Sequence, residues 1–193
     1  MLDFNNMGEE NTNELYFFAL LTPFNITAEV DEIKREFTEK YESSRALKSP
    51  PHITIIPPFF ANDDFEKSIE NKVNVFVKNC EPFNVTLNGF GEFNNKVIFV
   101  EIEKNESLQL FYTAFSAFFT GLGFELTSMN KFFHPHVTVA FRDLTKENFE
   151  KAWPEFKKRE FVGRFSASSI HLLKHKGEKW NVVKEFRFGG SKQ

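Results

Sequence analysis

The chain has 193 residues, which suits one large domain, and its 41% hydrophobic and 26% charged residues argue against intrinsic disorder. Its formal net charge of −3 disfavours binding to an extended nucleic-acid duplex, because proteins that neutralise many phosphates carry a basic excess. Charge therefore leaves a small anionic ligand, or only the end of a nucleic acid, as the expected partner.

The N-terminal segment, residues 1–13, is acidic and rich in amides, and we expect it to be flexible. It has neither the basic nor the apolar region of a secretory signal. The single cysteine, Cys80, rules out an intramolecular disulfide, and both observations predict a cytoplasmic location. The longest apolar runs, such as residues 15–21, are far shorter than the ~20 residues that cross a bilayer, so we expect no membrane contact.

The first half of the chain predicts the order strand, helix, loop, strand, helix, strand. Apolar residues 15–21 indicate the first strand, and Thr27 is the expected N-cap of the helix that follows. The second strand is expected at residues 52–59, and Asn62 is the expected cap of the next helix. Alternating apolar and polar residues at 83–93 indicate the third strand.

The second half repeats this order. The predicted elements are a strand at 97–102, a helix at 107–120, a strand within 134–141, a helix capped by Thr145, a strand ending near Lys174 and a last strand at 180–188. Spacing supports the repeat, because His52 and His136 lie 84 positions apart, as do the Phe-Glu-Lys tripeptides at 65–67 and 149–151. We predict a single bilobal domain, residues 1–193, built from repeats at about 15–93 and 95–188 that are related by a pseudo-twofold axis.

The pattern Pro-His-x-Thr-hydrophobic occurs twice, once in each repeat. Alternate side chains of a strand share a face, so His52 and Thr54 point one way and their apolar neighbours the other. His136 and Thr138 repeat the arrangement. If the pseudo-twofold axis brings these polar faces together, the result is a pocket with two imidazoles and two hydroxyls.

This set of side chains suits displacement at phosphorus. One histidine can act as the base for the attacking oxygen and the other as the acid for the leaving oxygen, since imidazole has a suitable pKa for both tasks. Threonine hydroxyls can donate to the non-bridging phosphate oxygens as charge develops on them. The chemistry requires neither a metal ion nor a cofactor.

The paired His-x-Thr strands resemble those of the two-histidine phosphoesterase superfamily. The layout of residues 15–188 looks like its branch of RNA 2′,3′-cyclic phosphodiesterases, also called 2′-5′ RNA ligases. The resemblance implies an α+β fold, in which two antiparallel sheets flanked by helices form two lobes around a central cleft that carries both motifs.

The same resemblance implies metal-free opening of a 2′,3′-cyclic phosphate to a 2′-phosphate, or reversible 2′-5′ joining of RNA ends. His52 and His136 would be the catalytic pair, with His136 as base and His52 as acid, and Thr54 and Thr138 would bind the phosphate. The chain departs from the family where IPPFF follows the first motif, because ligase-like bacterial members more often carry a Phe-Leu-Gly run. This departure leaves the substrate open.

Further contacts to the substrate are expected from side chains near the motifs. The candidate cations, of which at least one should face the cleft, are Arg45, Lys48, Lys131, Arg142 and Lys174. Lys174 ends a strand that matches the penultimate hairpin of the family and is expected to reach the cleft. Phe133 is a candidate for stacking on a base, with core packing as the favoured alternative, and Trp153 and Trp180 are expected in the core.

Several other interpretations compete with this one. A histidine-triad hydrolase fails because Thr138 stands at the third position, and a metal site at His134 and His136 lacks a neighbouring Cys or carboxylate ligand. His171 and His175 are expected to have packing or surface roles. A phosphodiesterase for small non-RNA nucleotides, such as 2′-5′ oligoadenylate or cyclic ADP-ribose phosphate, and a non-catalytic protein that binds RNA ends or nucleotides both stay open. In each case we expect a monomer.

Overall fold

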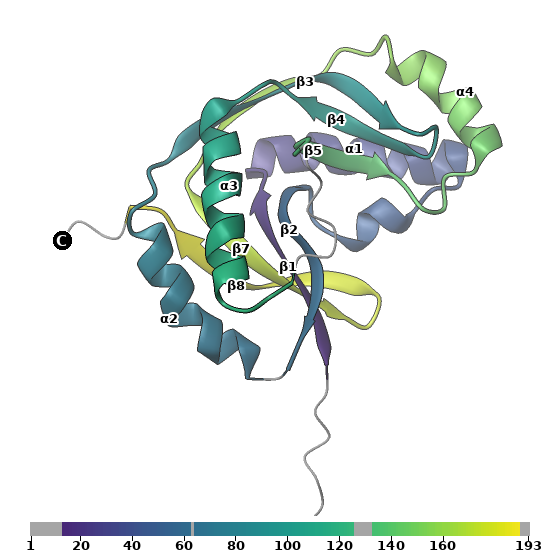
Figure 1. Ribbon diagram of the computed structural model, residues 1–193. Coiled ribbons are helices and arrows are strands. Elements are labelled where there is room, and N and C mark those ends of the chain that lie inside the picture. Colours follow the sequence, from purple (N-terminus) through teal and green to yellow (C-terminus); the bar gives the residue numbers. More distant parts are fainter. Residues whose placement is uncertain (1–12, 63, 126–132, 190–193) are drawn as a thin grey trace, which may run out of the picture.

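A computed structural model describes residues 13–62, 64–125 and 133–189. Within these residues, two four-stranded antiparallel sheets make up the fold (Figure 1). Sheet A contains, in spatial order, β2 (His52–Ala61), β1 (Glu14–Leu21), β7 (Ser169–Lys176) and β8 (Lys179–Arg187). Sheet B contains β5 (His136–Ala140), β4 (Val97–Ile102), β3 (Phe83–Phe93) and β6 (Val162–Ala167). The predicted α+β fold with two antiparallel sheets is confirmed.

Helices flank both sheets. They are α1 (Phe24–Tyr41), α2 (Phe65–Val77), α3 (Glu106–Gly121) and α4 (Lys146–Phe156), and a short 3-10 helix, η1 (Arg45–Lys48), follows α1. α2 packs on β8 of sheet A, and α3 lies against both β2 of sheet A and β3 of sheet B. α1 packs on β5 and on α4 at sheet B. None of the helices within the described residues is long and apolar enough to cross a membrane.

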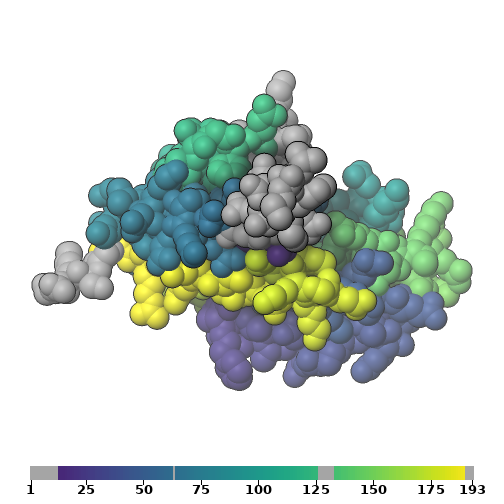
Figure 2. Space-filling model, turned by 90° about the horizontal axis from the view of Figure 1, so that it is seen from below, coloured from purple at the N-terminus to yellow at the C-terminus, as the bar shows by residue number. Residues whose placement is uncertain are grey.

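The two sheets do not coincide with the two sequence repeats. Strand β3, which ends the first repeat, pairs with β4 and β6 in sheet B, while β7 and β8 from the end of the chain join β1 in sheet A. In Figure 2 the yellow C-terminal strands cross the middle of the molecule, with α2 on one side and α4 on the other. Each lobe therefore contains strands from both halves of the chain.

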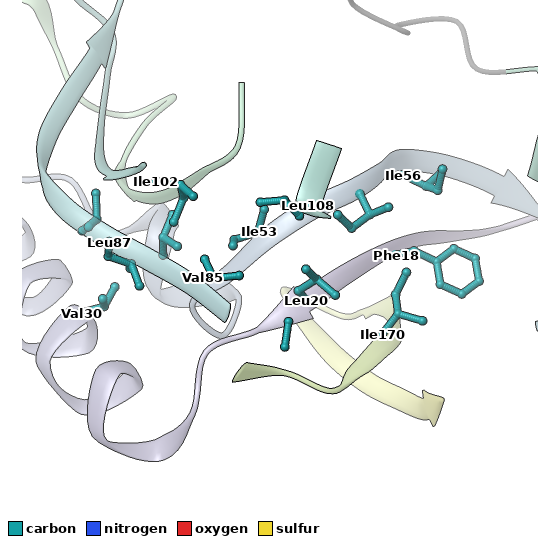
Figure 3. Close-up of a cluster of buried hydrophobic side chains, with 14 of the residues drawn as sticks. Phe18, Leu20, Val30, Ile53, Ile56, Val85, Leu87, Ile102, Leu108 and Ile170 are labelled. Atoms are coloured by element: carbon teal, nitrogen blue, oxygen red, sulfur yellow. The ribbon is translucent and has the colours of Figure 1, made fainter. Parts of the chain in front are cut away.

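One hydrophobic core joins the two lobes (Figure 3). Leu20 and Ile53 of sheet A and Val85 and Leu87 of sheet B are fully buried in the same cluster, together with Leu108 of α3. Burying an aliphatic side chain of this kind contributes about 1.5–3 kcal/mol. This shared core fixes the distance and angle between the sheets, and with it the geometry of any site between them.

Helix starts differ in detail from those predicted. α1 begins at Phe24, directly after Pro23, and the Thr27 hydroxyl donates to the Thr22 carbonyl (2.9 Å) and caps no helix. Asn62 uses its backbone carbonyl, which accepts from the Phe65 N–H at the start of α2 (3.1 Å). The Thr145 hydroxyl accepts from the Asn148 N–H (3.2 Å), so that cap is confirmed.

Candidate active site

The two His-x-Thr motifs begin neighbouring strands from different sheets. β2 carries His52 and Thr54, β5 carries His136 and Thr138, and these two strands contact each other across the lobes. Ile53 and Val137, which separate the His and the Thr of each motif, are buried in the core, as the alternation predicts. His52, Thr54 and Thr138 line one cavity of about 230 Å³, and a proton on His136 is near enough to lower the pKa of His52.

In both motifs a hydrogen bond to a backbone carbonyl orients the imidazole. Nδ1 of His52 lies 2.6 Å from the Pro50 carbonyl, and Nδ1 of His136 lies 2.8 Å from the His134 carbonyl, two residues upstream in each case. Because a carbonyl can only accept, Nδ1 must carry the hydrogen and donate it. The neutral ring then has its lone pair on Nε2, the nitrogen that can take up a proton.

Burial favours the neutral form of both rings. It lowers the pKa of His52 to about 4, against the opposing bond to Pro50 and with help from the positive charges of Lys34 and His136. Burial also lowers the pKa of His136, and a positive charge on His134 adds to that shift, whereas the bond to the His134 carbonyl and the nearby Glu101 carboxylate oppose it. A phosphate anion placed between the rings would raise both pKa values, because an adjacent negative charge stabilises imidazolium.

Aromatic rings surround each imidazole. The Phe17 ring lies 4.8 Å from His52, and the Trp180 ring meets Phe17 edge-on at 4.6 Å. On sheet B, Phe93 and Phe99 lie 5.0 and 4.9 Å from His136. Trp180 was expected in the core, but it is half-buried and lines the motif cavity, because its strand presents it to the cleft face of sheet A.

Arg142 is the candidate cation that lines the motif cavity. It follows β5, and its φ of 57° lies in the left-handed region that residues with a side chain seldom adopt. Arg45 is exposed on η1, and Lys48 forms an ion pair with Glu178 (3.0 Å) on a neighbouring surface. Lys131 lies outside the described residues.

Lys174 does not reach the cleft as the sequence suggested. It pairs in register with Tyr16, a fully buried residue on the core face of β1, so its side chain emerges on the face of sheet A away from the motifs. Its ammonium group lies 3.4 Å from the Glu14 carboxylate and 3.3 Å from that of Glu66. Two carboxylates therefore neutralise the charge that was expected to meet a phosphate.

Phe133 lies beside a second, larger cavity. Its ring is parallel to that of Tyr112, with centroids 3.8 Å apart, and it packs against the core, which was the favoured alternative. The cavity it lines, of about 500 Å³, also contacts Glu101 and His134. It adjoins the second motif from the side of the loop that enters β5.

Sequence reasoning missed two charged residues near the histidines. Lys34 is 1% exposed, donates to the Ser49 carbonyl (2.9 Å) and pairs with Asp31 (3.1 Å). Glu101 is the cross-strand neighbour of His136, and its carboxylate lies 2.8 Å from Nε2 of His134. The sequence pattern contained a sign of both. Lys34 occupies a position on the apolar stripe of its helix, where a charged residue is unusual. Glu101 lies two residues from Phe99 on the same strand, so both side chains point to the cleft face.

Metal ligands are not clustered in the described residues. No group of three or more His, Cys, Asp and Glu side chains comes together there. One expectation was wrong: no carboxylate was expected near His134 and His136, but that of Glu101 on the paired strand lies 2.8 Å from Nε2 of His134.

Comparisons with known proteins bear on the family and the fold of this chain. A family model described as the 2′-5′ RNA ligase superfamily matches residues 22–179. A provisionally named phosphoesterase of Geobacillus sp. (strain WCH70) is 23% identical over 85% of this chain and 92% of its own length. Another, of Bacillus anthracis, is 28% identical over 78% of this chain and 86% of its own length.

Solved structures of similar fold cover nearly the whole chain. TT0787 of Thermus thermophilus has a TM-score of 0.65 at 20% identity, over 92% of this chain and 99% of its own. LigT of E. coli complexed with 3′-AMP has a TM-score of 0.61 at 17% identity, over the same shares of the two chains. At these identities the likeness concerns the fold.

Proposed function

This chain belongs to the 2′-5′ RNA ligase superfamily, and on that premise we propose that it is a phosphoesterase acting on 2′,3′-cyclic phosphates or 2′-5′ linkages at RNA ends. His52 and His136 serve as its acid–base pair. The observation that carries the proposal is that two imidazoles, each held by a backbone carbonyl at Nδ1, begin contacting strands, and that His52 and both motif threonines line one cavity between them. This pairing provides proton transfer and phosphate binding within one site.

The reaction on a 2′,3′-cyclic phosphate is a single displacement. One histidine takes a proton from water on Nε2 while the water oxygen forms a bond to phosphorus. The bond from phosphorus to the ribose O3′ breaks, and the other histidine, as imidazolium, protonates that oxygen to leave a 2′-phosphate. Each proton transfer of this kind is worth about 10²–10⁴ in rate.

Thr54 and Thr138 are the proposed phosphate ligands. Each hydroxyl donates to a non-bridging oxygen, and Arg142 adds positive charge at the edge of the same cavity. A volume of about 230 Å³ is small for a whole nucleotide. The base therefore lies outside the cavity, against Trp180, whose ring the buried Phe17 supports edge-on.

A small nucleotide is a second candidate substrate. The observation that favours it is that, among the candidate cations in the described residues, Arg142 lines the cavity, whereas Lys48 is paired with Glu178 and Lys174 lies on the opposite face of sheet A. A long RNA strand would require more contacts to its phosphates. The 3′-AMP in the LigT structure is a ligand of this smaller size, held by a protein of similar fold.

The test is turnover of 2′,3′-cyclic nucleotides in EDTA, with the product isomer identified by phosphorus NMR. We expect the 2′-phosphate. Replacing His52 or His136 with Ala should reduce kcat/KM by at least about 100-fold, and the double variant should lose much less than the product of the two. Thr54→Ala and Thr138→Ala should lose about 10- to 1000-fold, whereas the exposed Thr113→Ala on α3 should lose nothing.

Three results would reject parts of this proposal. A 3′-phosphate product would mean that the other ester bond breaks. Turnover by His136→Ala within a few-fold of the unmodified protein would end the acid–base assignment. Tight nucleotide binding without turnover would instead identify a non-catalytic binding protein.

A further inference from the structure

A further cavity adjoins the motif cavity on the side of sheet B. Its volume is about 600 Å³, and it lies between the β3–β4 hairpin, which contributes residues 94–97, and the segment that leads from β5 to Lys146 of α4. Phe141 and Arg142 line this space and the motif cavity alike, so the two cavities share a wall. A ligand in the small motif cavity can therefore extend past Arg142 into this space, which we call the hairpin cavity.

The hairpin cavity is positively charged. Lys96, Arg142 and Lys146 line it, and no Asp or Glu of the described residues does so. Lys146 lies 3.8 Å from Glu150, but both side chains of this pair are largely exposed, so solvent weakens their attraction. In a protein with a net charge of −3, three cations around one cavity indicate a site for an anion.

The acids nearest in sequence are bound elsewhere. Asp143 follows Arg142 directly, yet its carboxylate accepts three hydrogen bonds of 2.9–3.0 Å from residues 43–45, in the segment before the first motif. Glu92, at the end of β3, accepts from the backbone N–H of Asn95 (2.8 Å). Neither acid lines the hairpin cavity, so its positive charge is available to a ligand.

A tight turn and an aromatic contact position two of the cations. Asn94 and Asn95 have φ values of 52° and 54°, as the centre of a two-residue type I′ hairpin requires. Lys96 closes this turn, because its N–H donates to the carbonyl three residues upstream (3.0 Å). The guanidinium of Arg142 lies over the Phe141 ring, 5.4 Å from its centroid, in the wall between the cavities. Arg142 can therefore contact an anion in either cavity.

We propose that the hairpin cavity binds a second phosphate of the substrate, carried on O5′ of the nucleoside whose 2′,3′-cyclic phosphate reacts. This inference rests on the proposed function, because it takes the motif cavity as the place of the reacting phosphate. The base and the 5′-oxygen leave a ribose from opposite ends, at C1′ and, through C5′, at C4′. The wall of the motif cavity contains Trp180 of sheet A and Arg142 after β5 of sheet B. One nucleoside can thus place its base against Trp180 and its 5′-phosphate beyond Arg142.

Such a subsite selects a class of substrate. A nucleoside 2′,3′-cyclic phosphate with a free 5′-hydroxyl leaves the hairpin cavity empty, whereas the end of an oligonucleotide fills it. Arg and Lys form charge-assisted hydrogen bonds to phosphate, which are stronger than neutral ones. Two phosphate contacts are still fewer than a protein makes along an extended strand. The preferred substrate is therefore a short oligonucleotide or an RNA 3′ end, bound through its last nucleotide.

The first test measures binding and needs no turnover. Titration calorimetry compares adenosine 2′-phosphate with adenosine 2′,5′-bisphosphate, which adds only the 5′-phosphate. We expect the bisphosphate to bind at least about tenfold more tightly. Lys96→Gln and Lys146→Gln should each remove most of this advantage, whereas Lys67→Gln, which deletes the same charge from the exposed face of α2, should keep it. Equal affinity for both ligands in the unmodified protein, or an advantage that all three variants keep, would reject the subsite.

The second test measures turnover. The dinucleotide ApA with a terminal 2′,3′-cyclic phosphate should have a kcat/KM at least about tenfold above that of adenosine 2′,3′-cyclic phosphate. The double variant Lys96→Gln, Lys146→Gln should bring this ratio close to one. A double variant that slows both substrates equally would place these lysines at the reacting phosphate and overturn the inference. If neither substrate turns over while the bisphosphate keeps its advantage in binding, the proposed function fails and the second phosphate subsite stands.

Discussion

At the scale of single residues, the site depends on groups that the backbone holds in place. Asp143 N–H donates to the Phe141 carbonyl (2.7 Å), and Arg142 between them has a φ of 57°. A hydrogen bond between the carbonyl of residue i and the N–H of residue i+2, with positive φ at the residue between them, defines the rare and strained form of γ-turn. The motif strand therefore ends in an unfavourable backbone conformation that brings a cation to the cavity.

This strain leads to a prediction for Arg142→Gly. Glycine adopts positive φ without a steric penalty, so the free energy of unfolding should stay unchanged or rise by up to about 1 kcal/mol. KM for a 2′,3′-cyclic nucleotide should rise about tenfold, because a cation at the phosphate is lost. Urea unfolding and steady-state kinetics measure the two effects.

Arg142→Ala is the matched control, because it removes the charge and keeps the strain. It should raise KM to the same extent without the gain in stability. An unchanged KM in both variants would remove Arg142 from the phosphate site, and a clearly destabilised Arg142→Gly would contradict the strain argument.

At the scale of elements, the sequence predicted strands well where only one face is apolar. The alternation at 83–93 placed β3 with its observed bounds. β7 is different, because Leu172 and Leu173 are both fully buried on opposite faces. Apolar residues on both faces hide the alternation, and the facing of Lys174 could then be known only from its pairing with Tyr16.

The direction in which Trp180 points from β8 likewise depends on strand pairing, here with His175 of β7. Its ring contacts Phe17 and lines the motif cavity. We expect Trp180→Ala to raise KM for a 2′,3′-cyclic nucleotide about tenfold and to leave kcat within a few-fold, since an aromatic ring stacking on a base is worth about 1–3 kcal/mol. The chain has two tryptophans, so Trp153→Phe makes Trp180 the single indole fluorophore. Its emission should change when a cyclic nucleotide binds. Emission that stays constant at saturating nucleotide would place the base elsewhere.

At the scale of the whole molecule, the repeat predicted the two motifs but not the arrangement of the sheets. Two contiguous repeats suggest two contiguous lobes, yet β3 leaves the first repeat for sheet B and the C-terminal strands return to sheet A. Nothing in the alternation of one strand specifies its partner, because partner choice depends on long-range packing. The proximity of the motifs followed from the symmetry, whereas Glu101 and Lys34 became part of the site only through tertiary contacts.

Beyond the exchanged strands, the lobes are joined through Asp143, which follows β5. Its carboxylate accepts from the Ser43 hydroxyl (2.9 Å) and from the N–H groups of Ser44 (2.9 Å) and Arg45 (3.0 Å), in the segment between α1 and the first motif. Partial burial raises the pKa of Asp143, but these bonds outweigh it and hold the pKa below its ordinary value. The contact therefore connects the two motif loops and requires the ionised carboxylate.

Asp143→Ala should lower the free energy of unfolding by about 1–2 kcal/mol at pH 7, because it leaves three donors without their acceptor. A carboxylate with a depressed pKa in the folded state stabilises above its unfolded pKa, near 4, and loses that contribution as the pH falls through the folded value. The difference between variant and unmodified protein should therefore shrink below pH 4 in urea unfolding. Glu150→Ala, an exposed acid on α4, serves as the control and should change stability little. A loss no larger than that of Glu150→Ala, or one that persists at pH 3, would show that this carboxylate does not hold the lobes together.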